Sequence, residues 1–230
     1  MGWWRSIILR KVLLLLKNNK IETFKKMGFL GKNMERTKPE IKVDIRPTGI
    51  ESAVIYALFD QALEALTKNG YDIISLAQNA QLRIQQGANS HISRNGNRVR
   101  EGVIYFPNGK PKLTPNSPIL ESALQATEAH ENREEFYLTS EQVEKALEDS
   151  VDFPQENIEI PTNRFAEEAL AVYAFGGEKG ARVYGEFLRN AGIKKMPVYV
   201  VSKDNVNSQS QPFARQMWFW GLDVGSGLSG

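Results

Sequence analysis

One glycine-rich motif near the carboxyl end has the spacing of a nucleotide-binding loop. Gly225, Gly227 and Gly230 form a G-x-G-x-x-G pattern after residues 222–224, and in dinucleotide-binding domains such glycines bring the backbone close to a pyrophosphate. That loop works only when a helix follows it, because the amino terminus of the helix faces the phosphates. No helix follows Gly230 in this sequence, so we expect an exposed Gly/Ser-rich loop and no cofactor.

Other residue types that carry catalysis or bind metal ions are present, but their spacing is unsuited to either task. His91 and His130 lack the i, i+4 histidine or flanking acids of a metal site. Neighbouring acids such as Glu134-Glu135 and Glu167-Glu168 fall in predicted helices, where adjacent side chains diverge. No serine lies in a G-x-S-x-G elbow. The sequence therefore predicts no catalytic residue and no metal site, and a non-enzymatic protein, although an active site assembled only by folding stays open.

The carboxyl-terminal segment has the composition of a binding surface. Trp218 and Trp220 lie within three residues of each other and close to Asp223 and Ser226. Tryptophan buries a large area at low entropic cost, and small polar residues add adaptable hydrogen bonds, a mixture that binding loops share. We therefore nominate these four residues as ligand contacts. The alternative is that both indoles fill the core and the Gly/Ser-rich end frays.

A basic segment offers a second function, nucleic-acid binding. Residues 83–112 hold six Lys/Arg and one acid, and we expect a β-hairpin that turns at residues 94–97. A basic β-ribbon can lie along a phosphate backbone. Its contacts would be the following basic residues: Arg94, Arg98, Arg100 and Lys110. The competing interpretation is a hairpin whose charges face solvent.

The segment from Pro212 to Gly230 also resembles a known family. It is similar to the start of the hypervariable carboxyl end in variable proteins of archaeal diversity-generating retroelements. In that family a Met-Trp or Leu-Trp pair, then Leu, Ser, Leu and Gly, form a fixed frame between positions that differ among copies. The matching frame residues in this sequence are Met217, Trp218, Leu222, Ser226, Leu228 and Gly230.

This resemblance implies a C-type-lectin-like fold that displays variable side chains for capture of a protein or surface ligand, without catalysis. It covers about twenty residues. The family continues into a closing strand rich in Arg and Val, which this sequence lacks, so we expect either a truncated copy or an accidental likeness. The helix-rich middle would then be an added domain or an elaboration.

Composition places the chain among ordinary globular proteins. It has 230 residues, 41% hydrophobic and 24% charged, with a net charge of +2, which suits one substantial core or two small ones. The absence of cysteine excludes a disulfide scaffold and a thiol nucleophile. It fits a reducing compartment, and we expect a cytoplasmic location.

The amino-terminal segment, residues 1–38, differs from the rest in charge. Residues 1–40 hold ten Lys/Arg and three acids, whereas the remainder holds nineteen and twenty-four. Arg10-Lys11 interrupts the apolar run well before the roughly 18 residues that cross a bilayer. Residues 1–17 could contact a membrane surface or a partner as a helix, or residues 1–33 could precede a true start at Met34, which is our preference.

The predicted elements give an α+β fold, a helix-rich body with short antiparallel hairpins whose carboxyl-terminal part is C-type-lectin-like. We divide it into a mixed helical and hairpin region, 39–153, and an α+β region, 154–230. Helices are expected at 48–69, opened by a Thr48/Glu51 capping box, and at 73–86, 119–135, 140–149, 162–175 and 181–191. Strands are expected at 103–106 and 196–201, and residues 107–118, 154–161 and 202–211 are expected to be loops.

Overall fold

The computed structural model describes residues 40–45 and 51–230 of the chain. Residues Lys38–Gly230 form one compact unit. The predictions for the basic segment 1–38, for a start at Met34, for membrane contact through residues 1–17 and for the Thr48 cap lie outside the described residues.

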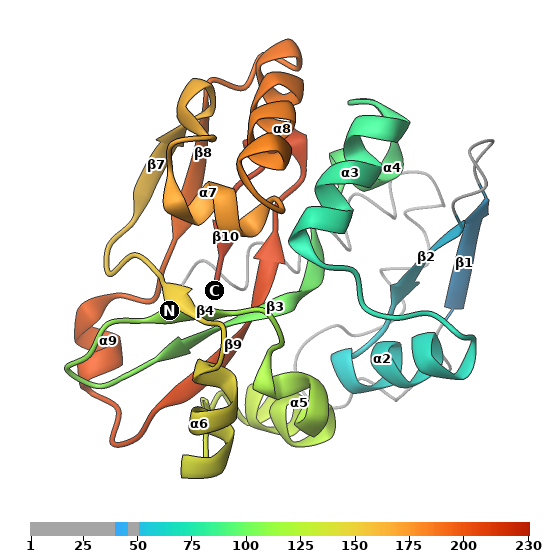
Figure 1. Ribbon diagram of the computed structural model, residues 1–230. Helices are drawn as coiled ribbons and strands as arrows, with labels where there is room; N and C mark the ends of the chain where they lie inside the picture. Colours follow the sequence, from blue (N-terminus) through green and yellow to red (C-terminus); the bar gives the residue numbers. More distant parts are fainter. Residues whose placement is uncertain (1–39, 46–50) are drawn as a thin grey trace, which may run out of the picture. The chain divides into compact units, whose positions relative to one another are not determined.

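An eight-stranded, curled sheet organises the fold (Figure 1). Its strand order is β6-β4-β3-β9-β10-β8-β7, and β5 also pairs with β9. All pairs are antiparallel except β10 with β8. The strands are β3 (Asn97–Tyr105), β4 (Lys112–Thr114), β5 (Phe136–Tyr137), β6 (Val151–Asp152), β7 (Ile158–Pro161), β8 (Lys195–Tyr199), β9 (Phe213–Phe219) and β10 (Leu228–Ser229). Trp218 is in β9, which therefore lies in the middle of the sheet, and Trp220 follows directly after this strand.

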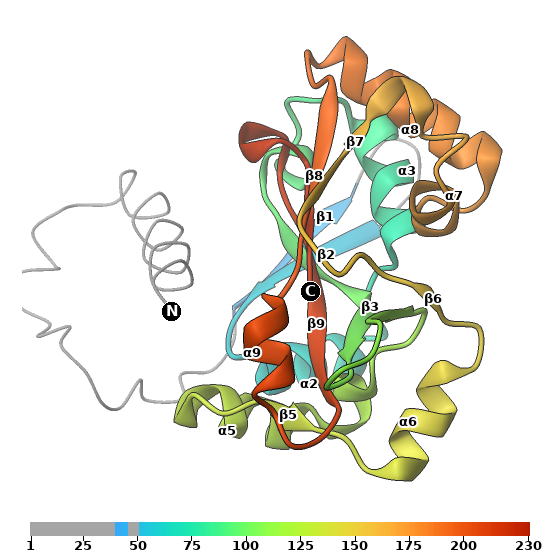
Figure 2. The ribbon, with the colours of Figure 1, turned by 90° about the vertical axis from the view of Figure 1, so that its left-hand side faces the viewer.

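Three helices cover one face of this sheet: α3 (Leu76–Gln86), α7 (Ala169–Ala174) and α8 (Glu178–Asn190) (Figure 2). The main core fills the space between these helices and the sheet. Phe213, Met217 and Phe219 of β9 pack there with Tyr184 and Leu188 of α8, all fully buried. Because side chains alternate along a strand, Ala214 and Trp218 of β9 point to the opposite face.

A second, smaller core lies under the remaining longer helices. It gathers Ile104 of β3, Ile119, Leu138, Ala146 and Ala214 of β9. Around it lie α2 (Phe59–Lys68), the 3-10 turn η2 (Pro118–Ser122), α5 (Ala123–Asn132) and α6 (Ser140–Leu147). The other elements are β1 (Glu40–Ile45), β2 (Glu51–Tyr56), α4 (His91–Arg94), η3 (Thr162–Arg164), α9 (Lys203–Asn207) and η4 (Leu222–Val224).

Local sequence signals set several boundaries as predicted. Thr139 and Gln142 form the capping box that opens α6. Gly177 directly precedes α8 and Gly192 follows it. Their φ angles of 96° and 84° are backbone conformations that residues with a Cβ rarely adopt. The α+β prediction is confirmed, including short antiparallel pairs such as β1 with β2.

The predicted helix at 48–69 was wrong in its first half. Residues Glu51–Tyr56 form β2, which pairs with β1 along its whole length, and the helix α2 begins only at Phe59. The apolar spacing of Val54, Leu58 and Ala62 fits a helix, but the β-branched pair Val54-Ile55 also suits a strand once a partner strand is present.

Three further predictions needed correction. No hairpin turns at residues 94–97, because Arg94 ends α4 and β3 pairs with β9 and β4 instead. The expected loops 107–118, 154–161 and 202–211 contain β4, β7 and α9. The predicted helix 162–175 is split between η3 and α7. These elements are only three to six residues long, so contacts with distant parts of the chain determine them more than the local sequence pattern does. Among the described residues, no helix has the length and apolar character needed to span a bilayer.

Candidate functional site

The outer face of β8, β10 and β9 carries an aromatic cluster. Ser229 of β10 is in register with Tyr199 of β8 on one side and with Trp218 of β9 on the other. Residues in direct register share a face of the sheet. Trp220 lies two residues beyond Trp218, and its main-chain N–H continues the pairing by donating to Gly227 O at 2.8 Å. The two nominated tryptophans are therefore brought together with Tyr199.

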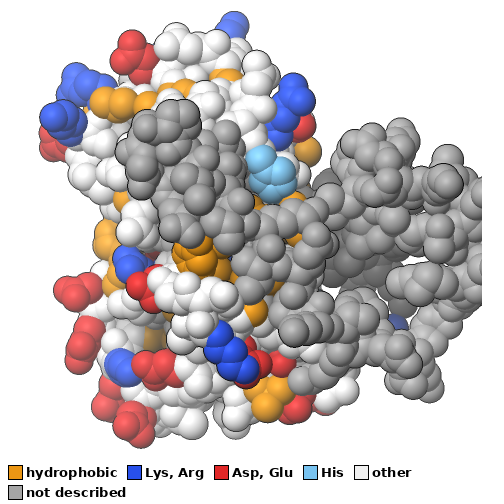
Figure 3. All heavy atoms as spheres, turned by 90° about the vertical axis from the view of Figure 1, so that its right-hand side faces the viewer, with side chains coloured by type: hydrophobic (Ala, Val, Ile, Leu, Met, Phe, Trp, Pro, Cys, Tyr) orange, Lys and Arg blue, Asp and Glu red, His pale blue; other side chains and the backbone are white. Residues whose placement is uncertain are grey.

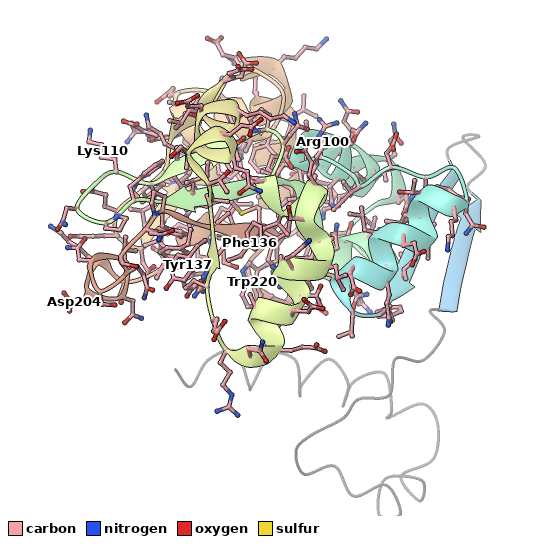
Figure 4. All side chains as sticks on the ribbon, turned by 90° about the horizontal axis from the view of Figure 1, so that it is seen from below. Arg100, Lys110, Phe136, Tyr137, Asp204 and Trp220 are labelled. Carbon is pink, nitrogen blue, oxygen red and sulfur yellow. The ribbon has the colours of Figure 1, made fainter. Side chains whose placement is uncertain are left out.

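Trp220 is held in place by polar and aromatic contacts. Its Nε1 donates to Ser229 Oγ at 3.1 Å. Its ring meets the Tyr199 ring edge-on, with centroids 6.2 Å apart, a favourable geometry for aromatic pairs. Trp220 is half-buried, whereas 43% of Tyr199 is exposed (Figure 4 labels Trp220). The pair forms an aromatic surface on a fixed support.

Trp218 lies in a cationic neighbourhood. The Arg98 guanidinium carbon is 5.5 Å from the Trp218 ring centroid, and Arg98 also donates to Gln216 O at 2.9 Å. Burial, with a smaller contribution from Arg215, lowers the pKa of Arg98 to about 10. Burial is also the main cause that lowers the pKa of His130, and both arginines add to it. The Trp218 indole therefore lies beside a buried positive charge.

A tight loop follows the tryptophans. Residues 221–226, here called the display loop, close on themselves through Ser226 N donating to Gly221 O at 3.0 Å and Val224 N donating to the same oxygen at 3.2 Å. Asp223 is exposed and Val224 is 56% exposed. Gly221 has no room for a side chain, because a Cβ there would lie 2.0 Å from Arg94 O. The loop thus presents two side chains from a closely packed base.

Buried polar groups anchor the base of the display loop. Arg83 of α3 is fully buried, and its Nη1 donates to Trp220 O at 2.8 Å, to Ser226 Oγ at 3.1 Å and to Tyr184 OH at 3.2 Å. Ser226 Oγ and Tyr184 OH are 2.7 Å apart. The Arg83 guanidinium also stacks 3.8 Å from the Phe219 ring centroid. These contacts tie both ends of the loop to helices α3 and α8.

The structure changes the assignment of one nominated contact. Ser226 has no exposed surface, since its hydroxyl points inward to Arg83 and Tyr184. Its side chain supports the loop and presents no surface to solvent. Trp218, Trp220 and Asp223 keep some exposed surface, and the structure adds Tyr199 and Val224 beside them. We call these five residues, Tyr199, Trp218, Trp220, Asp223 and Val224, the recognition face.

The basic residues of the nucleic-acid alternative are not gathered. Arg98 lies against Trp218, and Lys110 lies 3.6 Å from Asp152. Lys110 follows the far end of the nine-residue β3, which places it on the order of 20 Å from Arg98, and Figure 4 shows Arg100 and Lys110 well apart. Arg94 ends α4 and is exposed. On the face in Figure 3, the coloured basic side chains are scattered among acidic ones.

Comparison with known proteins identifies the fold. Neither a protein-family model nor a curated protein matches the chain. A solved structure from work described as "Accommodation of massive sequence variation in Nanoarchaeota by the C-type lectin fold" superposes with a TM-score of 0.57, over 85% of this chain and 93% of that chain, at 15% identity. The chain has a C-type-lectin-like fold. The likeness extends far beyond the twenty residues that suggested it, so the C-type-lectin-like fold includes much of the helix-rich middle.

Sequence reasoning missed Arg83, Tyr199 and Val224. The position of Arg83 could have been recognised from the sequence. It lies seven residues after Leu76 and three after Ala80, on the buried face of the predicted helix. An arginine at such a position must find acceptors inside the fold. Tyr199 and Val224 carried no such sequence signal, since their exposure depends on strand pairing that brings β8 beside β10.

Among the described residues, no group of three or more His, Cys, Asp or Glu side chains is arranged to hold a metal ion.

Proposed function

We propose that this protein is a non-catalytic ligand-binding protein whose recognition face displays side chains on a C-type-lectin-like scaffold. One observation carries the proposal: Asp223 and Val224 are exposed on a loop whose two ends are hydrogen-bonded to buried Arg83. A fixed loop that carries exposed side chains loses little conformational freedom when it binds, which favours affinity.

The distribution of burial supports a variable-protein role. Of the six frame residues, Met217, Ser226 and Leu228 are fully buried and Leu222 packs on the core. Both exposed residues of the segment 217–230, Asp223 and Val224, lie between frame positions. Replacement of exposed residues costs little stability, whereas replacement of buried ones costs more. The segment therefore suits a protein whose copies differ at the surface positions.

We further propose that the protein is a variable protein of an archaeal diversity-generating retroelement. The frame residues and the solved neighbour, whose description concerns sequence variation in Nanoarchaeota, support this assignment. The DNA around the gene tests it. A near-identical template repeat of the region that encodes residues 211–230 would support the assignment, and a locus without such a repeat would contradict it.

A library experiment tests the display role without a known ligand. Asp223 and Val224, the exposed pair, would be randomised together in one library, and the buried frame residues Ser226 and Leu228 in a matched control library. We expect most members of the first library, and few of the second, to keep a cooperative thermal transition close to that of the parent. Selection of the first library against unrelated target proteins should then yield specific binders. Equal loss of folding in both libraries would contradict the proposal.

A further inference from the structure

A hollow on the helical side of the sheet is separate from the recognition face. It has a volume of about 410 Å³ and is lined by residues from α3, β3, the segment after β4, the segment after α6, and α7. This volume falls within the range of small-molecule sites. Its polar lining includes Arg100, Glu101, Asn116, Asp149 and Tyr173.

An irregularity in β3 aims two consecutive charged residues into this hollow. The register between β3 and β9 shifts between Arg98 and Gly102. Within the shift, Arg100 leaves the ladder: its N–H donates to Ile74 O at 2.9 Å, and its carbonyl accepts from Ser117 N at 3.0 Å. Neighbouring residues of a regular strand point to opposite faces, but a bulge re-aims them. Arg100 and Glu101 can therefore line the same hollow.

Glu101 retains unused hydrogen-bonding capacity. The residue is only 7% exposed, and Leu76 N lies 3.0 Å from both of its carboxylate oxygens. A carboxylate can accept about four hydrogen bonds. Burial raises the pKa of Glu101 to about 7, against the lowering effects of main-chain N–H groups and Arg100. A buried carboxylate of this kind gains from a cation that enters the hollow.

Arg100 supplies the complementary charge. Within the described residues no ion pair or side-chain hydrogen bond engages its guanidinium, and its Nε is buried without a partner. Arginine binds carboxylates through paired N–H donors. The lining also includes Ala77, Pro115, Ala174 and Tyr173. An unused acceptor, an unused donor and an apolar wall thus occur in one hollow.

We propose that this hollow binds a small zwitterion of the α-amino-acid class. Its ammonium group would lie against Glu101, its carboxylate against Arg100, and an apolar side chain against Pro115 and Tyr173. Asp149, which is exposed, adds a second carboxylate to the lining. This site stands independently of the recognition face.

The proposal is tested by measuring the binding of L-leucine to the full chain with titration calorimetry and with amide chemical shifts. Leucinamide and N-acetyl-leucine each lack one of the two charges, and we expect each to bind about tenfold or more weakly than leucine. Glu101→Gln keeps an acceptor for Leu76 N but removes the charge, and it should abolish leucine binding. Arg100→Gln should weaken it about tenfold.

Two controls separate this site from the recognition face and from misfolding. Asp223→Ala should leave leucine binding unchanged, so failure of the display proposal would not affect this result. Thermal transitions of both hollow variants show whether they fold. The groups that face Glu101 are Arg100, Asp149, Tyr173 and the amino terminus of α3. Since Glu101 is protonated below about pH 7, leucine should bind about tenfold or more weakly at pH 5.5 than at pH 8.

Three results would each overturn the proposal. The first is that the amide chemical shifts of residues 75, 100, 101, 116 and 173 do not change with leucine at roughly 20 mM, which is about the weakest affinity of a specific small site. The others are equal binding of leucine and leucinamide, and unchanged leucine binding by a folded Glu101→Gln protein.

Discussion

Arg83 lies in α3 and Glu101 contacts the first residue of α3; both are buried and charged, and their surroundings differ. Arg83 is enclosed: its Nη1 contacts three acceptors, and its guanidinium stacks on Phe219. Glu101 lies at the wall of an open hollow. Hydrogen bonds from one guanidinium nitrogen to three of the protein's own acceptors position a neighbouring loop, whereas a charge that faces a hollow can meet a ligand. Both residues carry the free-energy cost of burying a charge near α3, but their roles differ.

Replacement of Arg83 tests the first half of this comparison and should have the largest effect. Arg83→Met fills similar space but leaves Trp220 O, Ser226 Oγ and Tyr184 OH without a charged donor. Burial lowers the pKa of Arg83, so removal of the charge recovers some desolvation energy. Lost hydrogen bonds to buried acceptors should outweigh that gain, and we expect the free energy of unfolding to fall by about 2–3 kcal/mol. Chemical denaturation measures it.

Amide hydrogen exchange shows whether the display loop is the part that loosens. In Arg83→Met, the N–H groups of Val224 and Ser226, which both donate to Gly221 O, should exchange faster relative to those of β3. Ser226→Ala is the matched variant: it removes one acceptor and should cost about 1–2 kcal/mol. A more stable Arg83→Met protein with unchanged exchange in the loop would show that Arg83 does not position it.

The pH dependence of stability tests the other side of the comparison, the buried carboxylate of Glu101. Its pKa is about 7 in the folded chain and near 4.5 when unfolded. Between these values the folded state binds the proton and the unfolded state does not, so stability from this group is present below pH 4.5 and is lost as the pH rises through 7. The loss is at most about 3 kcal/mol.

Glu101→Gln should remove this slope. Urea unfolding at pH 5 and pH 8 would give a smaller difference for the variant than for the parent, and the variant should be the more stable protein at pH 8. Asp149→Asn, at the exposed rim of the hollow, is a control that should change the slope little. An unaltered slope in Glu101→Gln would mean that the carboxylate is not the titrating group.

Arg83 and Glu101 also show which features of the structure can be predicted from the sequence and which cannot. The α+β class, the Thr139 capping box and the C-type-lectin-like fold could be predicted, because they depend on local pattern or on a short motif. The placements of Arg83 and Glu101 could not, since Arg83 meets Ser226 across 143 residues and Glu101 lines the hollow only through the register shift in β3. Contacts between such distant residues follow from strand pairing that no local pattern encodes.

The exposed residues of the display loop should give the smallest change in stability. Asp223→Ala and Val224→Ala remove side chains that face solvent, and we expect the free energy of unfolding to change by less than about 0.5 kcal/mol. Trp220→Ala should cost more, roughly 1–2 kcal/mol, because its indole contacts Tyr199 and Ser229. Binders selected on the parent loop should lose affinity with all three variants. If Asp223→Ala destabilised the protein as much as Arg83→Met, the loop would be part of the core, and the distinction between a displayed surface and its buried support would fail.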